Sequence, residues 1–461
     1  MLLFLLGLAI LIVGYCTYGK FIENILEPDD RPTPAKTRAD GVDYVELPHW
    51  KNMLIQLLNI AGVGPVIGVI LGIKFGVIAF VIIPIGNIIG GAVHDFTAGM
   101  MSLRHDGANL PALIRMTTGK TFYFIFSLFM IFLLLLVVAV FINIPARLID
   151  GFWPSDALFW TAVLCIFLYY IAATLFPVDK IIGSVYPLFG AMLILGTLAI
   201  FGVLMYEAIG NPALLEESAA FKAAMFTPEN NMPILPMLFV TIACGILSGF
   251  HATQSPIIAR TMKHEKQARS SFYGMMVVEG VIGMIWAAAG LAIYNLFPQM
   301  MAENPTNVLT EITTHFLGRG VGAITVISVI ILAITSGDTA MRSMRLSLAE
   351  IVGVDQKSIR NRIILCLPLI AIVSGLLWWS NQSAKTFNQL WNYFAWGNQV
   401  LASCTLTAVT VWLVSRRKPG WVTAVPGAFM TFIVASFILR ISTEHAGPVG
   451  YGLNLHCAYL V

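Results

Sequence analysis

The chain has 461 residues, of which 58% are hydrophobic and only 11% charged, and its net charge is +3. So much apolar surface cannot be hidden in one water-soluble core, which excludes a single soluble domain and predicts an all-α polytopic membrane protein. The small net charge gives no reason to expect a nucleic-acid partner; the expected partners are a small-molecule substrate and the lipid bilayer.

Apolar stretches of about 20 residues, the length that spans a bilayer as a helix, predict about 12 transmembrane helices. The first run lacks a basic start and a small-residue cleavage site, so we expect a retained helix and not a signal peptide. The predicted spans fall near residues 2–18, 53–73, 76–98, 121–144, 157–175, 184–206, 235–258, 272–297, 318–340, 361–379, 390–414 and 422–440.

The basic residues are distributed unevenly between the two sets of predicted loops. The loops that follow the odd-numbered spans hold 21 of the 27 Lys and Arg. Positive loops remain in the cytoplasm, so the asymmetry predicts a plasma (inner) membrane protein of a prokaryote with both termini outside. No loop is long enough for a soluble domain.

Residues 59–68, within the second predicted span, should interrupt that helix. Pro65 removes a backbone donor, and Gly62 and Gly64 permit conformations that a helix does not use. Proline is favoured in the first turn of a helix, so Gly64 and Pro65 are expected to cap and begin a second half-helix.

The run 248–256 (SGFHATQSP) places polar side chains inside the seventh apolar span. An interrupted helix at membrane depth is tolerated only where it is buried in protein or lines a cavity, which makes the run a candidate substrate site. A restart at Ser255 and Pro256 would aim a positive helix end at the membrane interior, as at Pro65, and would suit a carboxylate. The candidate binding residues of this run are Ser248, Gly249, His251, Thr253, Gln254 and Ser255.

The two interruptions lie five spans apart and therefore cross the membrane in opposite directions. Broken helices at matched positions of two inverted halves indicate a secondary transporter with its site between the halves. The simpler interpretation is that Gly and Pro only kink these helices. The repeat interpretation divides the chain into 1–52 (first helix and cytoplasmic loop), 53–206 and 235–414 (the two repeats), and 422–461 (last helix and external tail).

Seven motifs resemble the carbon starvation protein A family, and they occur in the family's order over nearly the whole chain. They are 31–35 (RPTPA), 40–45 (DGVDYV), 61–68 (AGVGPVIG), 91–96 (GAVHDF), 102–107 (SLRHDG), 177–183 (PVDKIIG) and 248–256 (SGFHATQSP).

The resemblance implies an inner-membrane carrier of the amino acid–polyamine–organocation superfamily, with a leucine-transporter-type 5+5 inverted repeat. It also implies uptake of peptides or pyruvate under nutrient limitation, driven by protons. Val69 and His94 depart from the family pattern, and the chain resembles a short form that ends at Val461.

His251 and Glu279 are ionisable residues inside predicted spans. Such residues are costly in a bilayer, so His251 is a candidate for substrate contact or proton carriage, and Glu279 for a proton relay. The alternatives are a histidine satisfied by a neighbour and a glutamate hydrated near the cytoplasmic end of its helix.

His94 and Asp95 lie toward the cytoplasmic end of the third span. They are interpreted either as part of an inner gate with Arg104 or the arginines after the ninth span, or as solvated helix-end charges.

The ninth span ends in Ser336, Asp338, Thr339 and Arg342, a set that also allows two interpretations. The oxygens of Ser336 and Thr339 would suit a sodium ion opposite the first broken helix. Asp338 and Arg342 could instead form an intrahelical pair, because they are four residues apart.

The eleventh span adds Asn398, a candidate substrate contact, beside an aromatic cluster that includes Phe394. Aromatic residues here either close over a substrate or anchor the membrane interface.

Together these patterns predict an alternating-access symporter for small carboxylate-bearing nutrients, coupled to protons. The alternatives are a sodium-coupled amino-acid-type symporter, a channel and a transporter-derived nutrient sensor. We find no hydrolase motif and no ligand spacing among the histidines, so neither an enzyme nor a cofactor is expected. The six isolated cysteines are interpreted as small buried residues.

Overall fold

The computed structural model describes residues 1–40, 44–175, 179–225, 233–354, 356 and 358–440, which leaves the predicted external tail at 441–461 outside the described residues. Over those residues, 10 helices are long and apolar enough to cross a membrane, or up to 12 when each of two bent helix pairs is one span. The predicted number and order of spans are confirmed, because every predicted span coincides with one of these segments.

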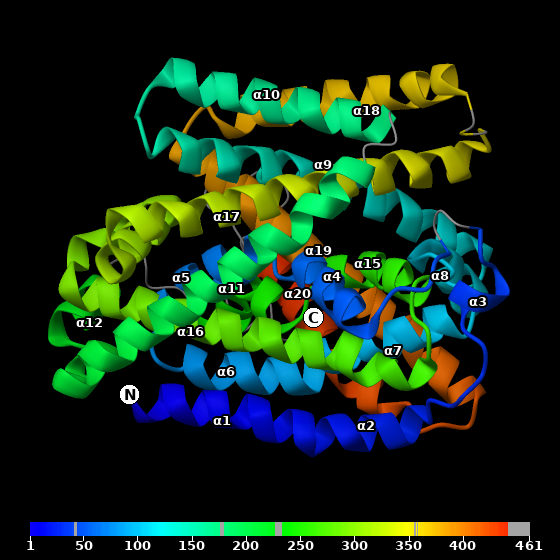
Figure 1. The fold of residues 1–461 in the computed structure, drawn as a ribbon, viewed down its shortest axis with the longest axis horizontal. Helices are drawn as coiled ribbons and strands as arrows, with labels where there is room; N and C mark the ends of the chain where they lie inside the picture. The colour runs from blue at the N-terminus through cyan, green and yellow to red at the C-terminus, as the bar shows by residue number, and fades with distance from the viewer. Residues whose placement is uncertain (41–43, 176–178, 226–232, 355, 357, 441–461) are drawn as a thin grey trace.

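The helices run side by side, with α10 and α18 on one side of the molecule, α1 and α2 on the other, and the short helices around α4, α5 and α15 between them (Figure 1). The spanning segments in chain order are α1 (Leu2–Cys16) with α2 (Tyr18–Leu26), α4 (His49–Ile60) with η1 (Gly64–Gly68), α5 (Val69–Gly72) and η2 (Ile73–Phe75), α6 (Ala79–Gly86) with η3 (Asn87–Gly91) and α7 (Ala92–Leu103), α9 (Lys120–Asp150), α10 (Asp156–Leu175), α11 (Asp179–Gly210), η5 (Ile234–Leu238) with α13 (Phe239–Thr241), α14 (Ala243–Ile246) and α15 (Phe250–Ala259), η7 (Arg269–Gly274) with α16 (Met275–Leu296), α17 (Pro305–Val352), α18 (Ile359–Ser380), α19 (Ala384–Ser415) and α20 (Trp421–Arg440). Shorter helices connect them: α3 (Pro34–Thr37), α8 (Leu110–Thr118), η4 (Pro212–Leu215), α12 (Ala219–Met225), η6 (Glu265–Gln267) and η8 (Pro298–Ala302).

The second span is broken where Gly62 and Pro65 predicted it. The segments His49–Ile60 and Gly64–Phe75 meet at an angle of 55°. Pro65 occupies the first turn of the second segment, where its missing amide costs no helical hydrogen bond.

The seventh span is also broken, but its second half begins earlier than the sequence suggested. Ile234–Thr241 and Ala243–Ala259 meet at 72°, and Leu247 is extended with φ −168° and ψ 107°. The helix resumes at Phe250, so the predicted restart at Ser255 and Pro256 is wrong, and Pro256 lies inside α15. A membrane helix can contain an internal proline without ending there. The break lies instead at Gly249, where the backbone of α19 comes so close that a side chain would not fit.

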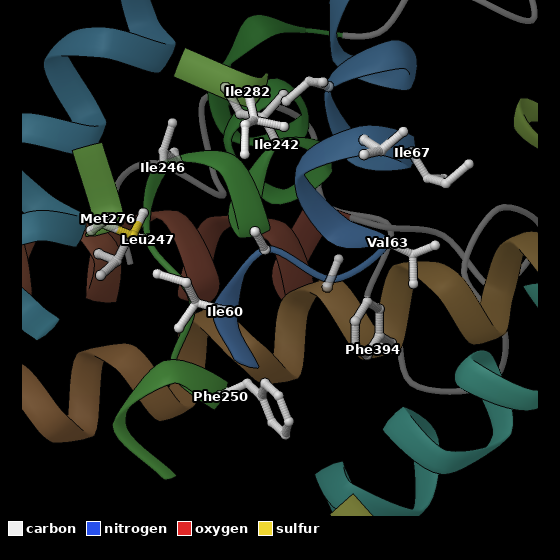
Figure 2. Packing of buried hydrophobic residues seen from close by; sticks show 14 of the residues in the cluster. Ile60, Val63, Ile67, Ile242, Ile246, Leu247, Phe250, Met276, Ile282 and Phe394 are labelled. Carbon is white, nitrogen blue, oxygen red and sulfur yellow. The ribbon is translucent and has the colours of Figure 1, made fainter. Parts of the chain in front are cut away.

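Glycines allow both broken spans to approach their neighbours closely. A Cβ atom on Gly64 would overlap Cys244, and one on Gly249 would overlap the backbone of α19 at Asn398 and Ala402. Apolar side chains from both breaks surround this crossing, among them Ile60 and Phe250 (Figure 2). The two interruptions therefore form one packed centre.

The ninth predicted span lies within the longest helix, α17. Its backbone is non-helical at Gly318, with φ 71° and ψ 171°. The predicted span at 318–340 begins at this bend, which separates it from the helical turns that start at Pro305. Glycine permits the bend because this φ lies in the left-handed region.

Replacement of Gly64 by Ala should lower the free energy of unfolding by about 1–3 kcal/mol, because the added methyl group overpacks the contact with Cys244. Unfolding in mixed detergent micelles containing sodium dodecyl sulfate would measure the change. The Gly64→Ala/Cys244→Gly double variant should recover most of the loss. Gly202→Ala is the matched control, since a Cβ there would meet nothing within 4 Å. Equal destabilisation by both alanine variants would contradict the proposed contact.

Candidate functional site

A small enclosed cavity lies where the two broken spans meet α9, α17 and α19. The space open to the centre of a water-sized sphere is about 20 Å³, enough for roughly one water molecule. Its lining residues are Asn59, Ile60, Gly62, Gly64, Phe141, Cys244, Ser248, Phe250, His251, Ser336, Phe394 and Asn398.

Six of the predicted site residues come together in this lining: Gly62, Gly64, Ser248, His251, Ser336 and Asn398. Five other predicted binding residues lie in the same two spans but outside the lining: Pro65, Gly249, Thr253, Gln254 and Ser255. The hydroxyl of Thr253 donates to the carbonyl of Phe250, and that of Ser255 to the carbonyl of His251. These two hydroxyls therefore satisfy backbone carbonyls of their own helix.

Asn398 of α19 holds the break in the seventh span. Its backbone carbonyl accepts the amide of Gly249 at 3.0 Å, and its side-chain oxygen accepts the hydroxyl of Ser248 at 3.4 Å. The Asn398 amide nitrogen donates to the carbonyl of Phe394 at 2.9 Å. A backbone group released by the break thus finds a partner in protein, as a low-dielectric site requires.

His251 belongs to a set of four buried ionisable side chains and is the member of that set that lines the cavity. Its Nδ1 lies 3.1 Å from Oδ2 of Asp95, whose Oδ1 lies 2.8 Å from Nδ1 of His94. On the other side of the ring, Nε2 of His251 lies 3.8 Å from Oε1 of Glu279. We call these four residues, contributed by α7, α15 and α16, the ionisable chain.

The burial of this chain overturns two of the sequence alternatives. His94, Asp95 and Glu279 are all 0% exposed, so they are neither solvated helix-end charges nor hydrated at a helix end. Arg104, a suggested gate partner of Asp95, forms an ion pair with Glu265 instead, at 2.5 Å. Asp95 is paired with the two histidines.

The composition of the ionisable chain limits the charge that it can carry. Two carboxyl groups and two imidazoles are together neutral when they share two titratable protons. A third proton would leave a net charge of +1 on side chains that are buried, which is costly unless an anion lies close by. Because His251 also lines the cavity, a carboxylate held there would be that neighbouring anion.

The four predicted site residues on α17 do not lie together: one lines the cavity, and the others lie away from it, toward α10. Ser336 lines the cavity opposite Gly62, and within the described part of the chain its buried hydroxyl has no hydrogen-bond partner. Asp338 accepts hydrogen bonds from Tyr169 of α10 at 2.6 Å and from Thr339 at 3.1 Å. Arg342 donates to the carbonyl of Ala173, also on α10. Only Ser336 of the four reaches the cavity.

Phe141 lines the cavity but carried no signal in the sequence, because it lies in a uniformly apolar stretch of α9. Its ring centroid lies 6.4 Å from that of Phe250 and 5.9 Å from that of Phe394. In the sequence, Phe250 was part of the polar run 248–256 and Phe394 part of the aromatic cluster, but neither was predicted as a site residue by itself. The three rings form one apolar wall of the site.

No group of three or more His, Cys, Asp or Glu side chains in the described residues is arranged to hold a metal ion.

Sequence comparison identifies the family. The profile described as "Carbon starvation protein CstA" matches residues 1–160, 155–316 and 295–436. The chain belongs to the CstA family. This CstA-family chain is 41% identical to an uncharacterized membrane protein of Haemophilus influenzae over 342 residues, which cover 64% of this chain and 91% of that protein.

Two relatives with functional names come from Escherichia coli. "Peptide transporter CstA" is 24% identical, with 92% of this chain and 78% of that protein covered. "Pyruvate/proton symporter BtsT" is also 24% identical, with 62% and 48% covered. These names support a transport role for this CstA-family chain.

Solved transporter structures share its fold. A manganese transporter of Eremococcus coleocola aligns with a TM-score of 0.56 at 14% identity, covering 92% of this chain and 94% of that one. A Na+-coupled sialic acid symporter aligns with a TM-score of 0.53 at 12% identity, covering 98% and 95%. The expected leucine-transporter-type fold with two broken helices is confirmed, while the repeat boundaries at 53–206 and 235–414 stay a prediction.

The contact between Asp95 and His251 should appear as an energetic coupling. In a cycle of Asp95→Asn, His251→Gln and the double variant, we expect the free energies of unfolding to deviate from additivity by about 1–3 kcal/mol, because both partners are desolvated. The matched control is the partly exposed pair of His315 and Glu207, 3.6 Å apart, which should give at most about 1 kcal/mol. Additive effects at Asp95 and His251 would exclude the contact.

Proposed function

We propose that this protein is a secondary active importer that couples uptake of a small carboxylate-bearing nutrient, pyruvate or a short peptide, to protons. The observation that carries the proposal is the ionisable chain, which is buried at membrane depth and reaches the cavity through His251. The names of two relatives, a peptide transporter and a pyruvate/proton symporter, support the same class of substrate.

The substrate carboxylate would bind between the two breaks. The half-helix that begins at Gly64 directs its positive end toward the membrane interior, where it favours an anion. Ser248 and Asn398 would orient the substrate through hydrogen bonds, since both side chains line the cavity. His251 would lie beside the carboxylate and carry the compensating positive charge.

Proton coupling would follow from charge balance. A carboxylate in the cavity offsets the third proton on the ionisable chain, so substrate and proton stabilise one another in the occupied site. Release of either one leaves an unbalanced charge and favours release of the other. This reciprocity is what a symporter needs.

Access to the site would alternate between the two sides of the membrane. The cavity is too small for pyruvate or a peptide as it stands, so binding requires its walls to move apart. We propose that the wall of Phe141, Phe250 and Phe394 separates on one side as the two repeats rock about the broken helices. The distribution of basic residues supports both termini outside the plasma membrane.

Glu279→Gln should abolish most proton-driven accumulation of substrate while leaving substrate exchange across the membrane intact. The variant removes one carboxyl group from the ionisable chain, so proton-driven accumulation in proteoliposomes should fall by about tenfold or more, while counterflow of bound substrate persists. The assay compares labelled pyruvate with di- and tri-alanine under imposed proton or sodium gradients. Loss of accumulation without loss of counterflow is the diagnostic result.

His315→Gln is the control for that assay, because His315 forms a partly exposed pair with Glu207 outside the ionisable chain. It should transport normally. Normal proton-driven uptake by both Glu279→Gln and His251→Ala would overturn the coupling mechanism. Flux that neither saturates nor shows counterflow would indicate a channel, and saturable binding without flux a nutrient sensor.

The buried hydroxyl of Ser336, which has no hydrogen-bond partner among the described residues, favours a second candidate, a sodium-coupled symporter of the amino-acid type. The hydroxyl lies opposite Gly62, and a hydroxyl oxygen is one of the hard ligands that sodium prefers.

If sodium is the coupling ion, Ser336→Ala should raise the sodium concentration for half-maximal uptake about tenfold, since one ligand is lost. Ser374→Ala on helix α18 is the control, because the Ser374 hydroxyl is outside the cavity lining and donates to the carbonyl of Ile370 in its own helix. If an imposed sodium gradient does not change the rate of uptake, the sodium-coupled mechanism is excluded and proton coupling is favoured.

A further inference from the structure

A second pocket, separate from the transport site, lies at the ends of α2, α7 and α19. Its volume is about 570 Å³, and four cationic side chains line it. We call it the basic pocket and define it by Arg31, Arg104, Arg416 and Lys418. These residues come from three distant parts of the chain, so only the fold assembles them.

Two of the family motifs that do not contribute to the central cavity lie at this pocket. Arg31 belongs to the run 31–35 and Arg104 to the run 102–107. Both contact the buried carboxylate of Glu265, Arg31 at 3.3 Å and Arg104 at 2.5 Å. Glu265 thus positions two guanidinium groups at the edge of one cavity.

The positive charge of the basic pocket exceeds the negative charge around it. Lys418 pairs with Glu27 at 2.6 Å, and Arg31 pairs with Asp29 at 2.6 Å. With Glu265 these carboxylates offset three of the four cations.

Arg416 is the cation left without a carboxylate. No Asp or Glu of the described residues lies within 4.0 Å of it, and its guanidinium stacks over the ring of Trp412 at 4.9 Å. Arg416 is exposed, but partial desolvation and then the charges of Arg104 and Arg31 lower its pKa, and the more distant charge of Glu265 offsets part of that shift. An anion in the pocket would relieve this repulsion and would find unused guanidinium donors.

The position of the pocket places it at the surface of the bilayer. It adjoins the C-terminal ends of three spans, at α2, α7 and α19, and α20 begins three residues after Lys418. The exposed rings of Phe21 in α2 and Trp421 at the start of α20 lie 6.0 Å apart, and such aromatic residues are enriched at headgroup level.

We propose that the basic pocket binds a phosphate group. Arginine forks recognise phosphate oxygens in pairs, and the apolar side chains of Leu26 and Trp412 in the lining suit the carbon skeleton attached to that group. The phosphate comes either from a phospholipid headgroup or from a soluble phosphate monoester. When bound, it joins the ends of α7 and α19, the helices that carry Asp95 and Asn398.

Binding can be tested on the full-length purified protein with two probes. Native mass spectrometry measures retention of dioleoylphosphatidylglycerol against dioleoylphosphatidylcholine. Thermal unfolding in detergent measures stabilisation by sn-glycerol 3-phosphate against sodium chloride of equal ionic strength. The variants are Arg416→Gln, Arg416→Lys and a matched control, Arg417→Gln, which removes the adjacent exposed charge that does not line the pocket.

We expect Arg416→Gln to weaken binding of the effective probe about five- to tenfold, with Arg416→Lys retaining part of it and Arg417→Gln all of it. An effect confined to phosphatidylglycerol identifies a lipid headgroup, and one confined to glycerol 3-phosphate identifies a soluble ligand. Should Arg416→Gln fold poorly without phosphate, Lys418→Gln makes the same comparison. Equal responses at positions 416 and 417, or no preference for either phosphate probe over its control, would overturn the proposal.

Discussion

The structure depends on one constraint, that backbone groups released by an interrupted helix must find partners inside the protein because the bilayer supplies none. At the seventh span the partner is α19, whose Asn398 carbonyl accepts the Gly249 amide. That bond requires the two backbones to touch, and glycine is the residue that allows it. At the second span Gly64 permits a close approach to the side chain of Cys244. The two breaks consequently pack against each other, and the space left between them is the cavity.

The electrostatic arrangement follows from where this cavity lies. Helix α7 packs against α15 and brings Asp95 to Nδ1 of His251, while Glu279 of α16 lies 3.8 Å from Nε2 on the other side of the ring. Removed from water, these groups are stable only as a nearly neutral set, and any change in their protonation must be balanced nearby. A binding site for an anion beside such a set is physically coupled to it. Asp338 belongs to a different network, because Tyr169 holds it against α10.

Charge compensation also applies at the basic pocket, but there the positive charges are not fully balanced. There Arg104 and Arg31 share the buried Glu265, and Lys418 is paired with Glu27. Among the described residues, Arg416 has no carboxylate within 4.0 Å, and its guanidinium lies over the ring of Trp412. The first span is an addition to the repeated halves of the predicted architecture, and its end supplies one wall of the pocket. The first span thus helps to form the proposed phosphate site at the membrane surface. It does not line the central cavity, which lies between the two broken spans.

Local properties of the sequence determined the twelve spans, the break at Pro65, the presence of a second break and the fold class. Apolar length, glycine and proline act within a single helix, so they can be recognised without knowledge of its neighbours. Only the tertiary structure decided that the seventh span resumes at Phe250 and not at Pro256, that His94 and Asp95 are buried, and that Phe141 lines the cavity. These outcomes depend on which helices pack together: Asp95 and His251 lie 156 residues apart in the chain, and no local pattern specifies that contact.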